Sequence, residues 1–114
     1  MRTHRTERLS SLLREELAFM FARDIELPGF FVTVTDVLVS DDHSHAVVRV
    51  SFLPSEGALK AFKQLEKELP RFEHVLWRKL NIRPMPHLSL EVDHGPENAA
   101  RVEKALLEDN NKER

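Results

Sequence analysis

The chain has 114 residues, of which 41% are hydrophobic and 32% are charged, with a formal net charge of −2 and no cysteine. This composition is typical of a single globular domain and excludes disulfide frameworks and thiolate metal sites. No apolar run approaches the roughly 20 residues that a membrane-spanning helix needs, and the N-terminus lacks the apolar core of a secretory signal. We therefore expect a cytoplasmic protein with no membrane partner.

The first predicted elements are a helix over about residues 6–23 and a strand over residues 30–39. Apolar residues recur at helical spacing and form one stripe along the helix: Leu9, Leu12, Leu13, Leu17, Met20 and Phe21. The strand segment, FFVTVTDVLV, is rich in β-branched and aromatic residues. Its alternation shifts by one residue near Thr35-Asp36, which indicates a β-bulge.

A second strand is predicted over residues 45–53, with alternate residues facing the core: Ala46, Val48, Val50 and Phe52. Only SDDHS separates the two strands, so they form an antiparallel hairpin. Its tip, residues 41–45 (DDHSH), suggests an alternative function, a metal-dependent hydrolase using this cluster with His87 or His94. Successive side chains at a hairpin tip splay apart, however, and Asp and Ser favour turns. We predict a structural turn in which Asp42 bonds the turn backbone.

Helical spacing returns after residue 55, with a buried side formed by Leu59, Phe62, Leu65 and Leu69. Pro70 interrupts this pattern, because proline lacks the backbone donor and its ring clashes with the preceding turn. The sequence therefore predicts two helices that meet at a structural kink at Leu69-Pro70. The second covers about residues 71–81 and buries Phe72, Val75, Leu76 and Leu80.

The last predicted elements are a strand over residues 87–93 and an amphipathic helix. The strand, HLSLEVD, alternates through Leu88, Leu90 and Val92, and Gly95-Pro96 turns the chain into the segment ENAARVEKALLE. We expect a single α+β domain over residues 1–108 with a three-stranded sheet and a C-terminal helix. Residues 109–114 are predicted to be a flexible tail.

Charge is distributed unevenly along the chain. Residues 1–14 carry four arginines against one glutamate, a local charge of +3, and residues 71–83 carry four basic residues against Glu73, again +3. Residues 15–59 hold eight acidic residues against two basic ones, a local charge of −6. Charge separated along a sequence often becomes separated on the surface, and a basic face suggests an anionic partner.

The two basic segments contain the candidate RNA-binding residues. Arg71, His74 and Arg78 fall on one side of the predicted helix over 71–81, and Trp77 lies beside them, off the buried stripe. Guanidinium groups bind phosphates and aromatic rings stack on unpaired bases. Arginines at the start of the first helix oppose the helix dipole, which an RNA backbone would offset. The predicted RNA contacts are Arg5, Arg8, Arg71, His74, Trp77, Arg78, Lys79 and Arg83.

Signals for catalysis are nearly absent from the sequence. There is no GxSxG nucleophile elbow, and no HExxH metal motif. The three glycines are isolated, so there is no phosphate-binding loop. We expect no catalytic residue, no cofactor and no bound metal.

Four segments, spread over about residues 4–108, carry spaced motifs. Arg5 and Arg8 form an R-x-x-R motif at the start of the first helix, and Pro28 precedes the first strand. The third segment matches T-x-V-x-x-S-x-D followed by A-x-V-x-V-S: Thr35, Val37, Ser40, Asp42, Ala46, Val48, Val50 and Ser51. The fourth matches L-x-R-x-x-P-x-L-x-F-x-x-D: Leu80 or Ile82, then Arg83, Pro86, Leu88 and Asp93.

Together these segments resemble the bacterial ribosome-binding factor A family over about residues 4–108. This resemblance implies a type II KH-like fold with a kinked helix pair in place of the usual GxxG loop. It also implies a non-enzymatic assembly factor that binds the free small ribosomal subunit (30S) and assists processing of its 16S rRNA late in maturation. The expected partners are 16S rRNA and the free small subunit, and we expect the protein to be a monomer.

The chain departs from the family pattern at four places. The kink commonly carries Ala-x-Gly, where this chain has Glu68-Leu69-Pro70. Glu73 and Gly29 stand where arginine is common, and Trp77 occupies a position that is usually small. The loss of positive charge bears on rRNA affinity rather than on the fold.

Overall fold

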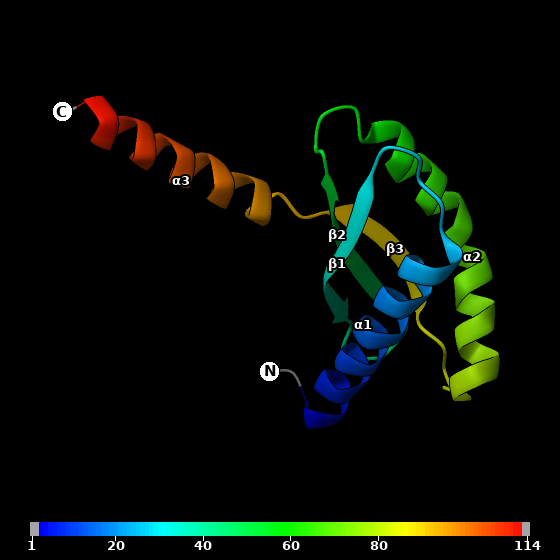
Figure 1. The fold of residues 1–114 in the computed structure, drawn as a ribbon. Coiled ribbons are helices and arrows are strands. Elements are labelled where there is room, and N and C mark those ends of the chain that lie inside the picture. Colours follow the sequence, from blue (N-terminus) through cyan, green and yellow to red (C-terminus); the bar gives the residue numbers. More distant parts are fainter. Residues whose placement is uncertain (1–2, 113–114) are drawn as a thin grey trace.

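The computed structural model describes residues 3–112, and the side chains of that range except those of residues 97, 100–102 and 108–112. Its elements are α1 (His4–Asp24), β1 (Phe31–Val39), β2 (His45–Leu53), α2 (Leu59–Leu80), β3 (His87–Val92) and α3 (Gly95–Lys112), shown in Figure 1. The α+β class, the three-stranded sheet and the C-terminal helix agree with the prediction. Within residues 3–112, no helix is both long and apolar enough to cross a membrane.

The sheet has the strand order β1-β2-β3. β1 and β2 pair antiparallel, and their register shifts between Val34 and Asp36, which confirms the predicted bulge at Thr35. β3 pairs parallel to β2, with His87 opposite His45. The sequence pattern had predicted the third strand but not its direction, because parallel pairing depends on how α2 returns the chain across the sheet.

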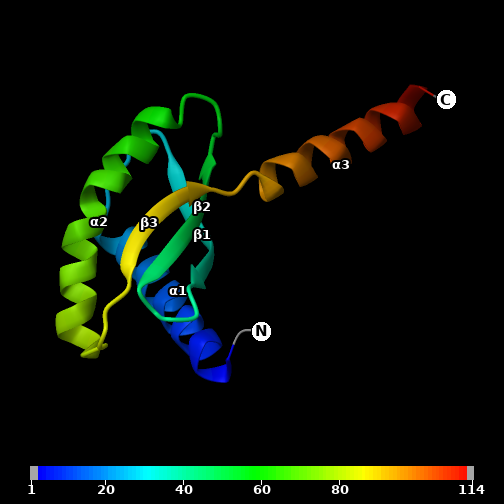
Figure 2. The same ribbon diagram turned by 180° about the vertical axis from the view of Figure 1, so that it is seen from behind.

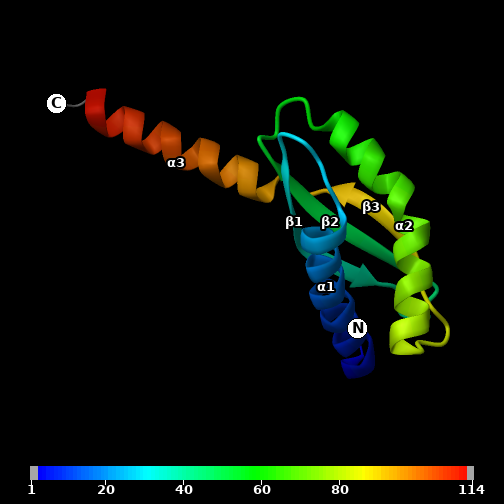
Figure 3. The same ribbon diagram turned by 45° about the vertical axis from the view of Figure 1, so that its right-hand side comes forward.

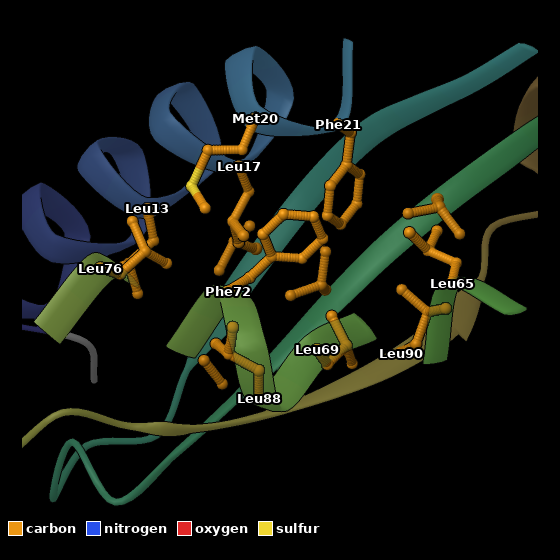
Figure 4. Packing of buried hydrophobic residues seen from close by; sticks show 14 of the residues in the cluster. Leu13, Leu17, Met20, Phe21, Leu65, Leu69, Phe72, Leu76, Leu88 and Leu90 are labelled. Atoms are coloured by element: carbon orange, nitrogen blue, oxygen red, sulfur yellow. The ribbon is translucent and has the colours of Figure 1, made fainter. Parts of the chain in front are cut away.

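The core lies between the sheet and helices α1 and α2, which cover the same face (Figures 2 and 3). Phe72 and Leu76 of α2 are fully buried and lie against α1 residues including Leu13 and Leu17 (Figure 4). The ring centroids of Phe72 and Phe21 are 5.3 Å apart, at a tilted angle of 49°. Such aromatic pairs contribute about 0.5–1.5 kcal/mol beyond the area that they bury.

Three apolar residues predicted to be buried are exposed instead: Leu12, Leu59 and Val75, at 39%, 66% and 38%. The reason in α1 is visible in the spacing of its buried residues. Thr6 and Ser10 are buried in line with Leu13 and Leu17, so two polar residues continue the core stripe and Leu12 lies at its edge. Helical spacing predicts a stripe, but the width of the stripe that is covered depends on the neighbouring elements.

The predicted division into two helices at Pro70 is wrong, because α2 is one continuous helix with Pro70 in its interior. A proline inside a helix removes one backbone hydrogen bond, and the helix usually accommodates its ring by bending. Figure 2 shows α2 bowed along its length where it passes β3. The proline therefore changes the direction of the helix without ending it.

Helix α3 extends away from the sheet after a short connection from β3 (Figures 1 and 2). Its Leu106 and Leu107 are each 60% exposed. The predicted domain boundary at residue 108 falls inside this helix, which reaches Lys112, and residues 113–114 of the predicted tail lie outside the described residues.

Candidate nucleic-acid interface

The hairpin tip is a hydrogen-bonded turn organised by Asp42. Its Oδ1 accepts from the backbone N–H of Ser44 at 3.0 Å and from the hydroxyls of Ser44 and Ser40, both at 2.7 Å. These bonds, led by the one from the Ser44 hydroxyl, hold the pKa of the Asp42 carboxyl far below its usual range. Asp42 thus bonds the turn backbone, as predicted from the sequence.

The other tip residues connect the hairpin to α1. His43 adopts the left-handed region, with φ of 60°, and its Nε2 lies 2.9 Å from the hydroxyl of the buried Thr6. Thr3 caps α1 by accepting from the N–H of Thr6. The hairpin tip therefore fixes the first turn of α1, a role for His43 that the sequence analysis missed because the contact spans the two elements.

The residues required by the hydrolase alternative do not converge on a metal site. His45 and His87 do approach each other, with ring centroids 6.2 Å apart, because their strands pair in register. Nδ1 of His87, however, lies 3.0 Å from the carboxylate of Glu73. Among the side chains that the structure describes, no group of three or more His, Asp or Glu could hold a metal ion.

The turn at Asp42 leads to a pH prediction. Because its pKa is lower in the folded state, the ionised carboxylate stabilises the fold above the unfolded pKa of about 3.9, and this stabilisation is lost as the pH falls through the folded value. We expect the difference in melting temperature between the unmodified protein and Asp42→Ala to be constant from about pH 7 to pH 5 and to shrink below about pH 4. Thermal unfolding followed by circular dichroism measures it. Asp42→Asn lacks the same titrating carboxylate, so its difference from the unmodified protein should shrink over the same pH range. A difference for Asp42→Ala that stays unchanged from pH 5 down to pH 2 would contradict this account.

The two basic segments of the sequence meet at one end of the molecule. Arg5 and Arg8 lie in the first turns of α1, Arg78 lies in the last turn of α2, and Arg83 follows α2. Figures 1 and 3 show the start of α1 and the end of α2 at the same end of the molecule. All four arginines are exposed, and none of them forms an ion pair within the part of the chain that the structure describes. We call these four residues the basic end.

Two other predicted phosphate contacts already have acidic partners. Arg71 Nε lies 2.7 Å from Glu68, and its guanidinium group also sits 4.8 Å from the centre of the Phe72 ring. Lys79 Nζ lies 2.8 Å from Glu16, which joins the end of α2 to α1. These two cations are less available to RNA than the basic end is, a distinction that the sequence could not show.

Trp77 and His74 lie together on the exposed side of α2. The Trp77 side chain is 43% exposed, and its ring centroid is 6.1 Å from that of His74, with 31° between the planes. The prediction that Trp77 lies off the buried stripe is therefore confirmed. Its ring is held on a helix beside Arg78, where a base could stack on it.

Glu73, which stands where arginine is common in the family, has a structural partner. Its Oε1 accepts from the backbone N–H of Leu88 and lies against His87, so the carboxylate fixes the start of β3. The change to an acidic residue lowers the charge of this surface but supports the strand.

Two residues of the resemblance motifs, Thr35 and Asp93, meet behind the bulge. The Thr35 hydroxyl donates to Asp93 Oδ2 at 2.7 Å, and Arg49 Nη2 lies 3.6 Å from the same carboxylate. The bond from Thr35, together with one from the backbone N–H of Gly95, lowers the pKa of the Asp93 carboxyl. The cluster joins β1 to the end of β3. It gives Thr35 of the third motif and Asp93 of the fourth motif a shared structural role.

The element order and the mixed three-stranded sheet with two helices on one face define an α+β protein of the KH-like class. A family model described as ribosome-binding factor A matches residues 5–106. The chain belongs to the ribosome-binding factor A family.

Relatives and solved structures of this family cover most of the chain. Ribosome-binding factor A of Caldanaerobacter subterraneus subsp. tengcongensis is 31% identical over 113 residues, covering 96% of this chain and 93% of the relative. That of Staphylococcus carnosus is 32% identical over 104 residues, covering 90% of each. The crystal structure of the Thermus thermophilus protein has a TM-score of 0.62 and 26% identity, covering 76% of this chain and 94% of that one. A Thermus thermophilus homology model fitted into a cryo-EM map of a 30S–RbfA complex has a TM-score of 0.66 and 28% identity, covering 75% and 92%.

Proposed function

We propose that this protein is a maturation factor of the small ribosomal subunit that binds 16S rRNA on free 30S particles in the cytoplasm. Membership of the ribosome-binding factor A family supports this proposal, as does the likeness to a chain placed in a 30S complex. The protein would act as a monomer, without a cofactor and without making or breaking covalent bonds.

The observation that carries the proposal is the basic end. Arg5 and Arg8 come from the start of α1, Arg78 and Arg83 come from the end of α2 and the segment after it, and these parts of the chain lie at the same end of the molecule (Figures 1 and 3). Because these four guanidinium groups have no ion-pair partner among the described side chains, each is available for a phosphate. Phosphate contacts of this kind supply most of the affinity of a protein for a nucleic-acid backbone.

In the mechanism that follows, the protein binds rRNA and holds it in one conformation. The phosphate contacts would position the protein on the rRNA, and the shared core of α1, α2 and the sheet would keep those contacts in a fixed arrangement. rRNA held in one conformation could then be processed by other factors. Arg5 and Arg8 would also lose the repulsion from the helix dipole once phosphates neutralise them.

Sedimentation of cell extract through a sucrose gradient tests the proposal. We expect the protein to travel with free small subunits, to be absent from translating ribosomes, and to shift to the top of the gradient as the salt concentration rises. Gradients of extract treated to separate all ribosomes into subunits provide the control. The proposal would be wrong if the protein stayed at the top of the gradient at low salt.

A further inference from the structure

A groove of about 350 Å³ lies between the second half of α2 and the segment that leads into β3. Trp77 and His74 line it from α2, and Met85 and Pro86 line it from the facing segment. Flat or compact apolar groups therefore form two opposing sides. The groove is shallow and open to solvent, which suits a single planar ring system laid against its wall rather than an enclosed ligand.

The rest of the groove is lined by Pro70 and by two polar residues, of which the Glu73 carboxylate carries the opposite charge to the arginines nearby. Glu73 and His87 belong to the groove, and both contacts of the carboxylate, to Leu88 and to His87, engage its Oε1. This leaves Oε2 of Glu73 and Nε2 of His87 to meet polar atoms of a ligand. A carboxylate in the groove repels phosphate and accepts hydrogen bonds, so it favours a ligand whose inserted part is uncharged and carries N–H donors.

The charges outside the groove favour an anionic backbone. Arg78 follows Trp77 directly, and Arg83 lies on the segment that leads to Met85. An RNA strand combines these requirements, because its phosphates meet the arginines while an unpaired base enters the groove. Base–aromatic stacking contributes about 1–3 kcal/mol per base. A carboxylate acceptor selects bases that present an exocyclic amino group, as Glu does with cytosine N4.

We infer that this groove binds one unpaired nucleobase of RNA, stacked on Trp77, with Glu73 favouring adenine, cytosine or guanine over uracil. The inference rests on the proposed function, since it names the part of the RNA that the same surface holds.

The single tryptophan reports directly on the groove, because the chain has one Trp and no Tyr. We would titrate the full protein with single-stranded oligoadenylate, oligocytidylate, oligouridylate and an abasic backbone of equal length. Quenching of the Trp77 fluorescence is expected with the first two, and weaker quenching with oligouridylate at equal saturation. The abasic strand should compete for binding, measured by displacement of labelled RNA, without quenching.

Substitutions separate the groove from the rest of the surface. Trp77→Ala should weaken binding of oligoadenylate by about 5- to 150-fold, the range that one stacked base contributes, while Trp77→Phe should retain most of it. Phe19→Ala removes a ring that is 57% exposed on α1 and should leave binding unchanged. Glu73→Gln should reduce the ratio of the affinity for amino-bearing bases to the affinity for uracil. A general loss of affinity would lower both affinities and leave this ratio unchanged.

The outcomes distinguish this inference from the proposed function. If RNA binds with arginine-dependent salt sensitivity but no base quenches Trp77, the groove proposal is overturned and the proposed function stands. If Trp77→Ala weakens binding to small subunits but rRNA extracted from them does not quench Trp77, the occupant is a protein and the groove proposal is again overturned. Equal quenching by all bases would overturn the role of Glu73, and an absence of any RNA binding would overturn both proposals.

Discussion

Replacing Arg5, Arg8, Arg78 and Arg83 together with alanine is expected to reduce the slope of log K against log[salt] for small-subunit binding by about 3 units. Each phosphate contact contributes about 0.7–0.9 to that slope, and the structure gives none of these four residues an ion-pair partner within residues 3–112. Affinity at low salt should fall for the same reason. Binding to purified small subunits at four or more salt concentrations measures both quantities.

The matched control is the double variant Arg71→Ala and Lys79→Ala. Arg71 already pairs with Glu68, and Lys79 already pairs with Glu16. We therefore expect each of these two substitutions to reduce the slope of log K against log[salt] by much less than each substitution in the basic end does. The thermal stability of the quadruple variant should be close to that of the unmodified protein, because the four side chains are exposed. An unchanged slope in the quadruple variant would show that the basic end is not the interface. Equal effects per residue in both variants would show that pairing does not decide which cations bind.

Phe72→Ala is expected to have the largest effect on folding. The side chain is fully buried between α1 and the sheet and packs against Phe21. Truncating a buried phenylalanine costs about 3–5 kcal/mol, against a total stability of about 5–15 kcal/mol for a domain of ordinary size. Urea unfolding followed by circular dichroism should therefore show a much lower midpoint.

Phe19→Ala is the control for this measurement as well, because the Phe19 ring lies on the exposed side of α1 with Arg23 above it. We expect it to change the free energy of unfolding by less than about 1 kcal/mol. A loss of less than about 1 kcal/mol for Phe72→Ala would mean that the centre of the core is elsewhere.

Sequence periodicity was sufficient for the local elements of this fold. The hairpin followed from alternation and a short polar turn, and even the bulge at Thr35 was visible as a shift in that alternation. Pro70 shows the limit of such reasoning, since a proline raises the local cost of a helix but packing of Leu69 and Phe72 keeps the helix continuous across it.

The sequence was sufficient to predict which residues make up the candidate interface, but not which of them have ion-pair or hydrogen-bond partners. The charge pattern identified both basic segments, whereas the partners of Arg71 and Lys79 depend on side-chain positions that no spacing rule gives. The contacts of His43 with Thr6 and of Glu73 with Leu88 join residues far apart in the chain. Only the packed structure brings such pairs together.

The parallel pairing of β3 with β2 has a consequence for the order in which the chain folds during synthesis. The α1–β1–β2 segment can assemble first, since its contacts are local and hairpins form quickly. At that stage one edge of β2 has no partner, because β3 follows only after residues 54–86. An unpaired edge on an apolar strand favours aggregation. The nascent chain is therefore most exposed to misassembly while α2 is being made, and the arrival of residues 87–92 ends that interval.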